Sequence, residues 1–321
     1  MPCLERPRLT VLFVTYNHAA YIRRAVEGVL MQSSSCRFEV IVADDKSTDD
    51  TCEIIDRLFA EYPDAPPIRY LDREVNRGIT ENYRRSFETC DTEFVAIIEG
   101  DDYWIDPNKL ARQVAFLDEH RECGAVSANY FVYDENACTF NARAAVNSEF
   151  SYIDARGLIN DNLIGNFSTC LYRVAAVKAI PKVMWSGTVY DWGVNICVAR
   201  TALIGFLHTP LSVYRVHNTG TWNRLSQNDR IVTQMNIIEH YNKSTDFVFD
   251  AEFESLSRRL ELLVVLTGGK RPLRRRIAAI LIACIPPGIL WVLKLAVGAA
   301  KQFLLPPIIP IFIKKLRKGR S

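Results

Sequence analysis

The stretch that decides the fold is Phe-Val-Ala-Ile-Ile-Glu-Gly-Asp-Asp at residues 94–102. Its five leading apolar residues are typical of a strand buried on both faces, as in a parallel sheet covered by helices. The three carboxylates that follow repel one another unless a cation or hydrogen-bond donors neutralise them. Such oxygen ligands suit Mg²⁺ or Mn²⁺ bound together with substrate phosphates. A solvated acidic turn is the alternative, but the position after a buried strand favours a binding site.

Similar units surround this segment. Strand-like apolar runs recur at residues 9–14, 40–43, 68–71, 125–133 and 204–214. Apolar residues at helical spacing lie between the earlier runs, at 21–31, 51–59 and 79–87. This alternation predicts an α/β fold with βαβ units, a mostly parallel central sheet and helices on both faces.

Polar residues follow the predicted strands at three places. They are Thr15, Tyr16 and Asn17, then Asp44 and Asp45, then residues 99–102. Because the carboxyl ends of parallel strands meet at one edge of a sheet, these clusters are expected to converge in a single crevice. Helix capping explains Ser47 and Asp50 but not Asp44 and Asp45, where a carboxylate can accept the N–H of a nucleobase.

Composition and charge exclude some classes of protein and of binding partner. A chain of 321 residues with 49% hydrophobic content can bury a large core, which excludes disorder as its main state. Residues 262–321 hold 12 Lys and Arg and no acid, whereas residues 1–261 hold 27 basic and 37 acidic residues, a net charge of −10. An acidic body argues against nucleic acid as a partner. With no metal-finger cysteine spacing and no apolar leader after Met1, the body is interpreted as cytosolic.

Four ordered motifs resemble the family 2 glycosyltransferases with the GT-A fold. They are Val-Thr-Tyr-Asn at 14–17, Asp-Asp-Lys-Ser-Thr-Asp-Asp-Thr at 44–51, Asn-Arg-Gly at 76–78 and Glu-Gly-Asp-Asp-Tyr-Trp at 99–104. The last motif looks like that of bacterial members that build surface polysaccharides. The resemblance covers roughly residues 8–225. It implies inverting transfer of a sugar from a nucleotide-diphosphate sugar, with a UDP-sugar favoured, to a hydroxyl of an acceptor glycan.

The resemblance also implies roles for individual residues. The nucleotide-binding set is Thr15, Tyr16, Asn17, Asp44, Asp45, Asp101 and Arg215. The residues implied for Mg²⁺ or Mn²⁺ are Asp101, Asp102 and His217. The residues expected on the acceptor side are Trp104, Asn166, Ser168 and Trp222. Asp191 matches the family's catalytic base; its alternative is an ordinary N-cap of a helix over 192–200.

The predicted organisation has three parts. Residues 1–225 form the GT-A domain, with a nucleotide-binding half at 1–122 and an acceptor-binding half at 123–225. A helical connector follows at 226–269, and an apolar helical tail with basic flanks at 270–321. Because both flanks of the tail are basic, we expect it to re-enter or lie on the cytoplasmic face of a bacterial inner membrane, near a lipid-linked acceptor. Helices docked on the body or on another subunit are the alternative.

Two other functions remain as alternatives. A sugar nucleotidyltransferase of related fold needs a glycine-rich phosphate loop after the first strand, and residues 15–20 contain no glycine. A non-catalytic, membrane-bound nucleotide-binding assembly protein would need no catalytic Asp191 beside Asp101 and Asp102.

Overall fold

The computed structural model describes residues 6–33, 37–142, 148–220, 222 and 225–267. Contacts divide the chain into two compact units, residues 1–257 and 258–321. The second unit is described only as far as the end of helix α9 (Asp250–Thr267). The tail predicted at 270–321 therefore lies outside the described residues. Across the described ranges, no helix combines the length and apolar character needed to cross a bilayer.

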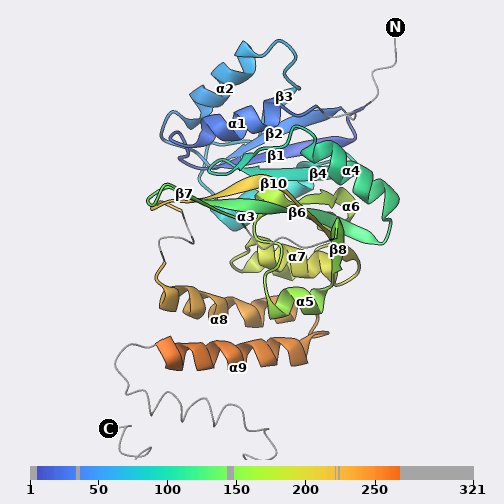
Figure 1. Cartoon of the computed structure of the whole chain (residues 1–321), viewed down its shortest axis with the longest axis vertical. Coiled ribbons are helices and arrows are strands. Elements are labelled where there is room, and N and C mark those ends of the chain that lie inside the picture. Colours follow the sequence, from blue (N-terminus) through green and yellow to red (C-terminus); the bar gives the residue numbers. More distant parts are fainter. Residues whose placement is uncertain (1–5, 34–36, 143–147, 221, 223–224, 268–321) are drawn as a thin grey trace, which may run out of the picture. The chain divides into compact units, whose positions relative to one another are not determined.

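The first unit is built on a ten-stranded sheet (Figure 1). Eight of its strands follow the order β3-β2-β1-β4-β9-β6-β10-β5, and outside this path β7 pairs with β6 and β8 with β10. Its first four strands are β1 (Leu9–Thr15), β2 (Phe38–Asp44), β3 (Ile68–Tyr70) and β4 (Phe94–Glu99). They pair in parallel, as the sequence predicts. The carboxyl ends of β1, β2 and β4 therefore meet at one edge of the sheet, where the polar clusters begin.

The second half of the sheet is mixed, which corrects the expectation of a mostly parallel sheet. Its strands are β5 (Tyr103–Trp104), β6 (Cys123–Asp134), β7 (Thr139–Ala142), β8 (Phe150–Ile153), β9 (Leu171–Arg173) and β10 (Leu203–Val216). Strand β9 runs antiparallel between β4 and β6, and β5 and β8 run antiparallel to β10. With only three residues, β9 forms too short an apolar run for periodicity to identify it.

Helices cover both faces of this sheet. Helices α1 (Ile22–Leu30), α2 (Thr51–Glu61) and α4 (Lys109–Glu119) share one apolar cluster with Leu9, Val11 and Phe13 of β1. Since successive side chains of a strand point to opposite faces, Thr10 and Leu12 lie on the other face. That face is covered by α3 (Ile79–Thr89), α6 (Val174–Lys178) and α7 (Asp191–Ala199). Each fully buried Val, Leu or Ile contributes about 1.5–3 kcal/mol to stability.

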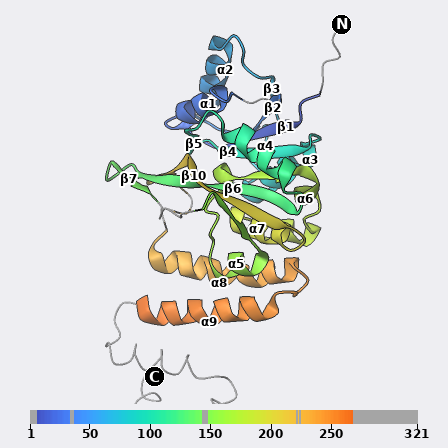
Figure 2. The same ribbon diagram turned by 45° about the vertical axis from the view of Figure 1, so that its right-hand side comes forward.

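Helix α8 (Gln227–Ser244) belongs to the same unit as the sheet, although it follows the predicted domain boundary at 225. It contacts the short helix η2 (Lys182–Ser186), and α5 (Ala155–Asn160) contacts α7. Two views place α5, α7 and α8 together, on the opposite side of the sheet from α1 and α2 (Figures 1 and 2). This side carries the half predicted to face the acceptor.

Candidate functional site

The loops after β1 and β2 are hydrogen-bonded to each other. The side-chain oxygen of Asn17 accepts the N–H of Thr48 at 2.7 Å, and the N–H of Asn17 donates to Oγ of Ser47 at 2.8 Å. Asn17 has a φ of 55°, in the left-handed region that Asn tolerates better than most residues. The two loops therefore form one rigid rim, which brings the predicted nucleotide-binding clusters together.

Besides Asn17, four predicted nucleotide-binding side chains lie on this rim. Both carboxylate oxygens of Asp44 accept hydrogen bonds from Ser47. The carboxylate of Asp45 accepts the N–H groups of Arg77 and Gly78, each at 2.8 Å. Thr15 is buried and bonds to the ring of His18, whereas Tyr16 is 46% exposed. Asp44 and Asp45 thus shape the loops, and the ring of Tyr16 is open to a ligand.

Asp101 and His217 meet, although they lie far apart in the sequence. Nε2 of His217 lies 3.1 Å from Oδ2 of Asp101, and Nε2 of His18 lies 3.9 Å from the same oxygen. Burial alone would raise the pKa of Asp101, but the hydrogen bond to His217 and the nearby His18 hold it below its usual value. A Cβ on Gly100 would lie 2.6 Å from Nδ1 of His18, so glycine permits this close approach.

Asp102, next to Asp101 in the sequence, is buried, and its carboxylate is hydrogen-bonded to the backbone of strand β10. Its Oδ1 accepts the N–H of Arg215 at 2.9 Å, and Nε of Arg215 donates to the carbonyl oxygen of Asp101 at 2.9 Å. Oδ2 of Asp102 is buried and accepts no hydrogen bond from the described chain. Burial, and then the charge of Asp101, raise the pKa of Asp102. A cation bound at Asp101 would reduce the repulsion between the two carboxylates.

Two of the residues expected on the acceptor side are structural. Trp104 is 2% exposed, and its indole N–H donates to the carbonyl oxygen of Ser168 at 2.8 Å. Ser168 is 1% exposed, and its Oγ accepts the N–H of Glu99 at 3.1 Å. Trp104 and Ser168 therefore lie behind residues 99–102, here called the acid motif, and do not line the pocket beside it.

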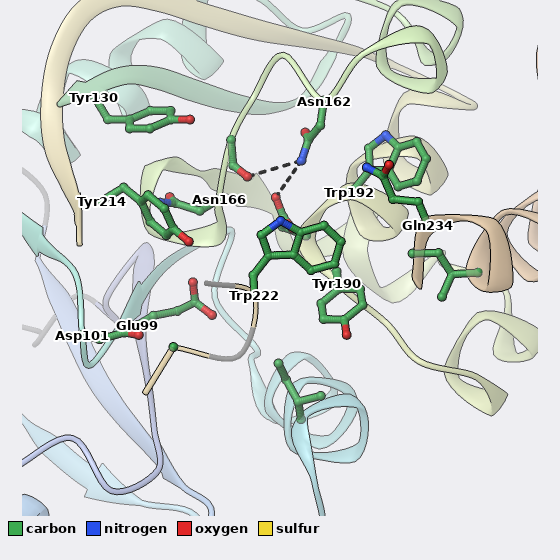
Figure 3. Close-up of a pocket in the computed structure, with 15 residues that line it drawn as sticks. Glu99, Asp101, Tyr130, Asn162, Asn166, Tyr190, Trp192, Tyr214, Trp222 and Gln234 are labelled. Carbon is green, nitrogen blue, oxygen red and sulfur yellow. Dashed lines mark hydrogen bonds between the residues drawn. The ribbon is translucent and has the colours of Figure 1, made fainter. Parts of the chain in front are cut away.

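A pocket of about 340 Å³ opens beside the acid motif. Its lining contains Glu99, Asp101 and Asp191 together with Asn166 and Trp222 (Figure 3). The wall comes from the end of β4, strand β6, the loop before η1 (Phe167–Thr169), the start of α7, the end of β10 and helix α8. The structure thus brings residues predicted for the nucleotide and metal site, for the base and for the acceptor side to one cavity.

Asp191 is the first residue of helix α7 and faces this pocket. Burial raises the pKa of its carboxyl group to about 6. The side-chain amide of Asn162 opposes this shift, because its Nδ2 donates to Oδ2 of Asp191 at 3.2 Å. A carboxylate with a pKa near neutrality and an oriented lone pair is suited to accept a proton from a bound hydroxyl.

The sequence reasoning missed several members of this site. His18, which the sequence analysis does not select, lies beside Asp101. Asn162 and Gln234 line the pocket, as do the aromatic residues Tyr130, Tyr190, Trp192 and Tyr214. Irregular segments carry no periodic signal. The position of Asn162, four residues before Asn166, which is expected on the acceptor side, is the one feature that could have drawn attention to it.

Comparisons with known proteins decide the family. The model for glycosyl transferase family 2 matches residues 10–180, which is more than half of the chain. The chain belongs to this family. The chain is 32% identical to an uncharacterized protein of Mycobacterium tuberculosis over 221 residues, and this alignment covers 67% of the chain and 60% of that protein. It thus spans less than two thirds of that relative's length.

Two further likenesses agree with this assignment. TuaG of Bacillus subtilis, a proposed teichuronic acid biosynthesis glycosyltransferase, is 24% identical over 211 residues, covering 62% of this chain and 80% of TuaG. The crystal structure of Staphylococcus aureus TarS in complex with UDP-GlcNAc superposes with a TM-score of 0.58 at 20% identity, covering 87% of this chain and 82% of that one. The predicted GT-A fold and the relation to bacterial surface-polysaccharide glycosyltransferases are confirmed.

Proposed function

We propose that this glycosyltransferase transfers a sugar, with inversion, from a UDP-sugar to a hydroxyl of a lipid-linked glycan during synthesis of a bacterial surface polysaccharide. One observation carries the proposal: Asp191 lines the same pocket as Asp101. Asp101 lies in turn beside His18, the residue after Asn17 of the rim. The UDP-GlcNAc bound to TarS supports a uridine nucleotide, and the surface-polysaccharide relatives support the acceptor class.

Asp191 acts in this proposal as the general base. Its ionised carboxylate takes the proton of the attacking acceptor hydroxyl, while the oxygen of that hydroxyl forms the new bond to the anomeric carbon. The bond from that carbon to the diphosphate breaks, and the nucleoside diphosphate leaves. A positioned base of this kind contributes about 10²–10⁴ to the rate.

A divalent cation fits the acid motif. Asp101 and His217 would hold it, with Asp102 behind them, because their oxygen and imidazole donors converge. Among the described residues, no three His, Cys, Asp or Glu side chains form a complete metal site. Mg²⁺ or Mn²⁺ bound by so few protein ligands takes the rest from substrate phosphates. When bound, the cation neutralises the charge that develops on the leaving diphosphate.

The place of action is part of the proposal. The basic flanks of residues 270–321 favour the cytoplasmic face of the inner membrane, where a lipid-linked acceptor is concentrated near the pocket.

A donor screen tests the proposed function. The full-length protein is incubated with individual nucleotide sugars, Mn²⁺ or Mg²⁺ and a bacterial lipid extract, and released nucleoside diphosphate is measured. We expect release with a UDP-sugar, dependent on the extract and abolished by Asp191→Asn. Release of pyrophosphate from UTP and a sugar 1-phosphate would instead identify a nucleotidyltransferase. Donor binding without turnover under every condition would favour a non-catalytic protein.

A further inference from the structure

The pocket wall next to Asp191 carries two hydrogen-bond acceptors that the described chain does not satisfy. The side-chain oxygens of Asn162 and Asn166 are buried and accept no hydrogen bond from any residue in the described ranges. Both residues line the pocket, and Asn166 is only 9% exposed. Because a buried polar atom without a partner is unfavourable, these oxygens are suited to a ligand that donates hydrogen bonds.

Aromatic rings surround these two oxygens. Figure 3 shows Tyr130 and Tyr214 on one side of Asn166, and Trp222 and Tyr190 on the other. The ring centroids of Tyr190 and Trp222 lie 5.7 Å apart in an edge-to-face arrangement, and those of Tyr130 and Tyr214 lie 6.4 Å apart. A sugar ring matches such a wall, because it has apolar C–H faces and a rim of hydroxyl donors.

The charge of the wall restricts the ligand further. The lining contains the three carboxyl groups of Glu99, Asp101 and Asp191, and none of its 15 described residues is Lys or Arg. An anionic group bound against Asn162 and Asn166 would face the carboxylate of Asp191, and the described lining residues offer no basic side chain to pair with it. An uncharged ligand avoids this repulsion.

Helix α8 completes the wall with Gln234 and Ile237. These residues lie beyond residues 10–180, which the family model matches. The amide of Gln234 adds a donor and an acceptor to an otherwise apolar part of the wall. This part of the pocket therefore belongs to the segment in which this chain extends past the matched family domain.

We propose that this wall is the acceptor subsite and that it binds an uncharged sugar ring. Hydroxyls of the ring donate to the side-chain oxygens of Asn162 and Asn166, and its faces lie against the surrounding aromatic side chains. The inference rests on the proposed glycosyl transfer and specifies its acceptor: the terminal unit is a neutral sugar, not a polyol phosphate or a uronic acid.

The test is ligand binding to the full-length protein by saturation-transfer NMR, in the presence of UDP and Mg²⁺. The neutral probes are the methyl glycosides of glucose, galactose, mannose and N-acetylglucosamine. The anionic probes are glycerol 3-phosphate, ribitol 5-phosphate and methyl glucuronide. We expect transfer to at least one neutral glycoside and to none of the anionic probes. Binding of an anionic probe as strongly as the best neutral one, or of no neutral glycoside, overturns the proposal.

UDP serves as the internal check in the same samples. Failure of UDP to bind contradicts the proposed function, whereas bound UDP without a bound neutral glycoside contradicts only the subsite. The two failures are therefore distinguishable.

Two variants locate the bound sugar. Asn166→Leu and Gln234→Leu should each weaken glycoside binding about tenfold, because each removes hydrogen-bonding groups at nearly constant volume. Neither should change the affinity for UDP. Asn236→Leu, on the exposed part of α8, is the matched control and should bind the glycoside as the unaltered protein does. Unchanged glycoside affinity in both pocket variants would place the sugar elsewhere and refute the subsite.

Discussion

The contact between Asn162 and Asp191 makes the pH dependence of transfer sensitive to one side chain. The base must be ionised to accept a proton, and burial raises the pKa of Asp191 to about 6. We therefore expect kcat/KM to be constant above that pH and to fall about tenfold per pH unit below it. The activity that depends on this base is thus present at high pH and lost as the pH falls.

Replacing Asn162 with Leu should move the acid limb of the pH profile, where kcat/KM falls, to higher pH. Nδ2 of Asn162 donates to Oδ2 of Asp191 at 3.2 Å, and this hydrogen bond favours the ionised form. A hydrogen bond to a charged group is worth about 1.5–3 kcal/mol. This hydrogen bond is long and the side chain of Asp191 is only partly buried, so the lower energy applies. That energy corresponds to a rise of about one unit in the pKa of Asp191. Relative to its own plateau above pH 8, activity at pH 6 should be about tenfold lower in the variant and about twofold lower in the unaltered protein. The plateau of the variant should also be lower, because Leu removes the acceptor contact proposed for the side-chain oxygen of Asn162.

The assay is nucleoside diphosphate release across the pH range for Asn162→Leu and the unaltered protein. Asn160→Leu, on the exposed face of α5, is the control for substitution of a nearby asparagine. A merely structural role would lower activity equally at every pH. An unshifted limb in a folded Asn162→Leu variant would refute the coupling between these two residues.

Further predictions concern the base, the metal, the backbone and the tail. Asp191→Asn should abolish turnover but keep donor affinity, measured by calorimetry; loss of both in a folded protein would remove Asp191 as the base. Asp101→Asn should weaken Mn²⁺-dependent donor binding at least tenfold, because it removes the charged ligand, and equal affinity with and without Mn²⁺ in the unaltered protein would exclude this site. Gly165→Ala should lower the free energy of unfolding by about 1–3 kcal/mol in urea titrations, since Gly165 has a φ of +102° and an added Cβ would lie 2.4 Å from the ring of Tyr130. Deleting residues 270–321 should release the protein from membranes, and a truncated form that still sediments with vesicles would contradict the anchor.

The half of the site built on regular strands could be predicted from the sequence. Apolar runs fix β1, β2 and β4, and parallel pairing then forces the residues after them to one edge. Asp45 and Asp101 lie on that edge for this reason. The match of Asp191 to the family's catalytic base selected it, and the structure makes it the first residue of α7, with Tyr190 at the N-cap.

The half built on irregular segments could not be predicted. Whether Trp104 faces a ligand or the core depends on its register against β10, and the sequence alone does not show that β5 pairs there. Asn162 and Asn166 lie in a loop whose course depends on Gly165 adopting a positive φ next to Tyr130. Such a backbone choice is set by tertiary packing, which periodicity does not report.

Strand β10 closes the acid motif from a position late in the chain. Arg215 and His217 bind residues that precede them by 113 to 116 positions. During synthesis, a ribosome-bound chain can thus fold its first βαβ units before Arg215 and His217, which are proposed to act at the diphosphate end of the donor, have emerged. We expect a prematurely terminated polypeptide that ends before Leu203 neither to bind nor to consume nucleotide sugars.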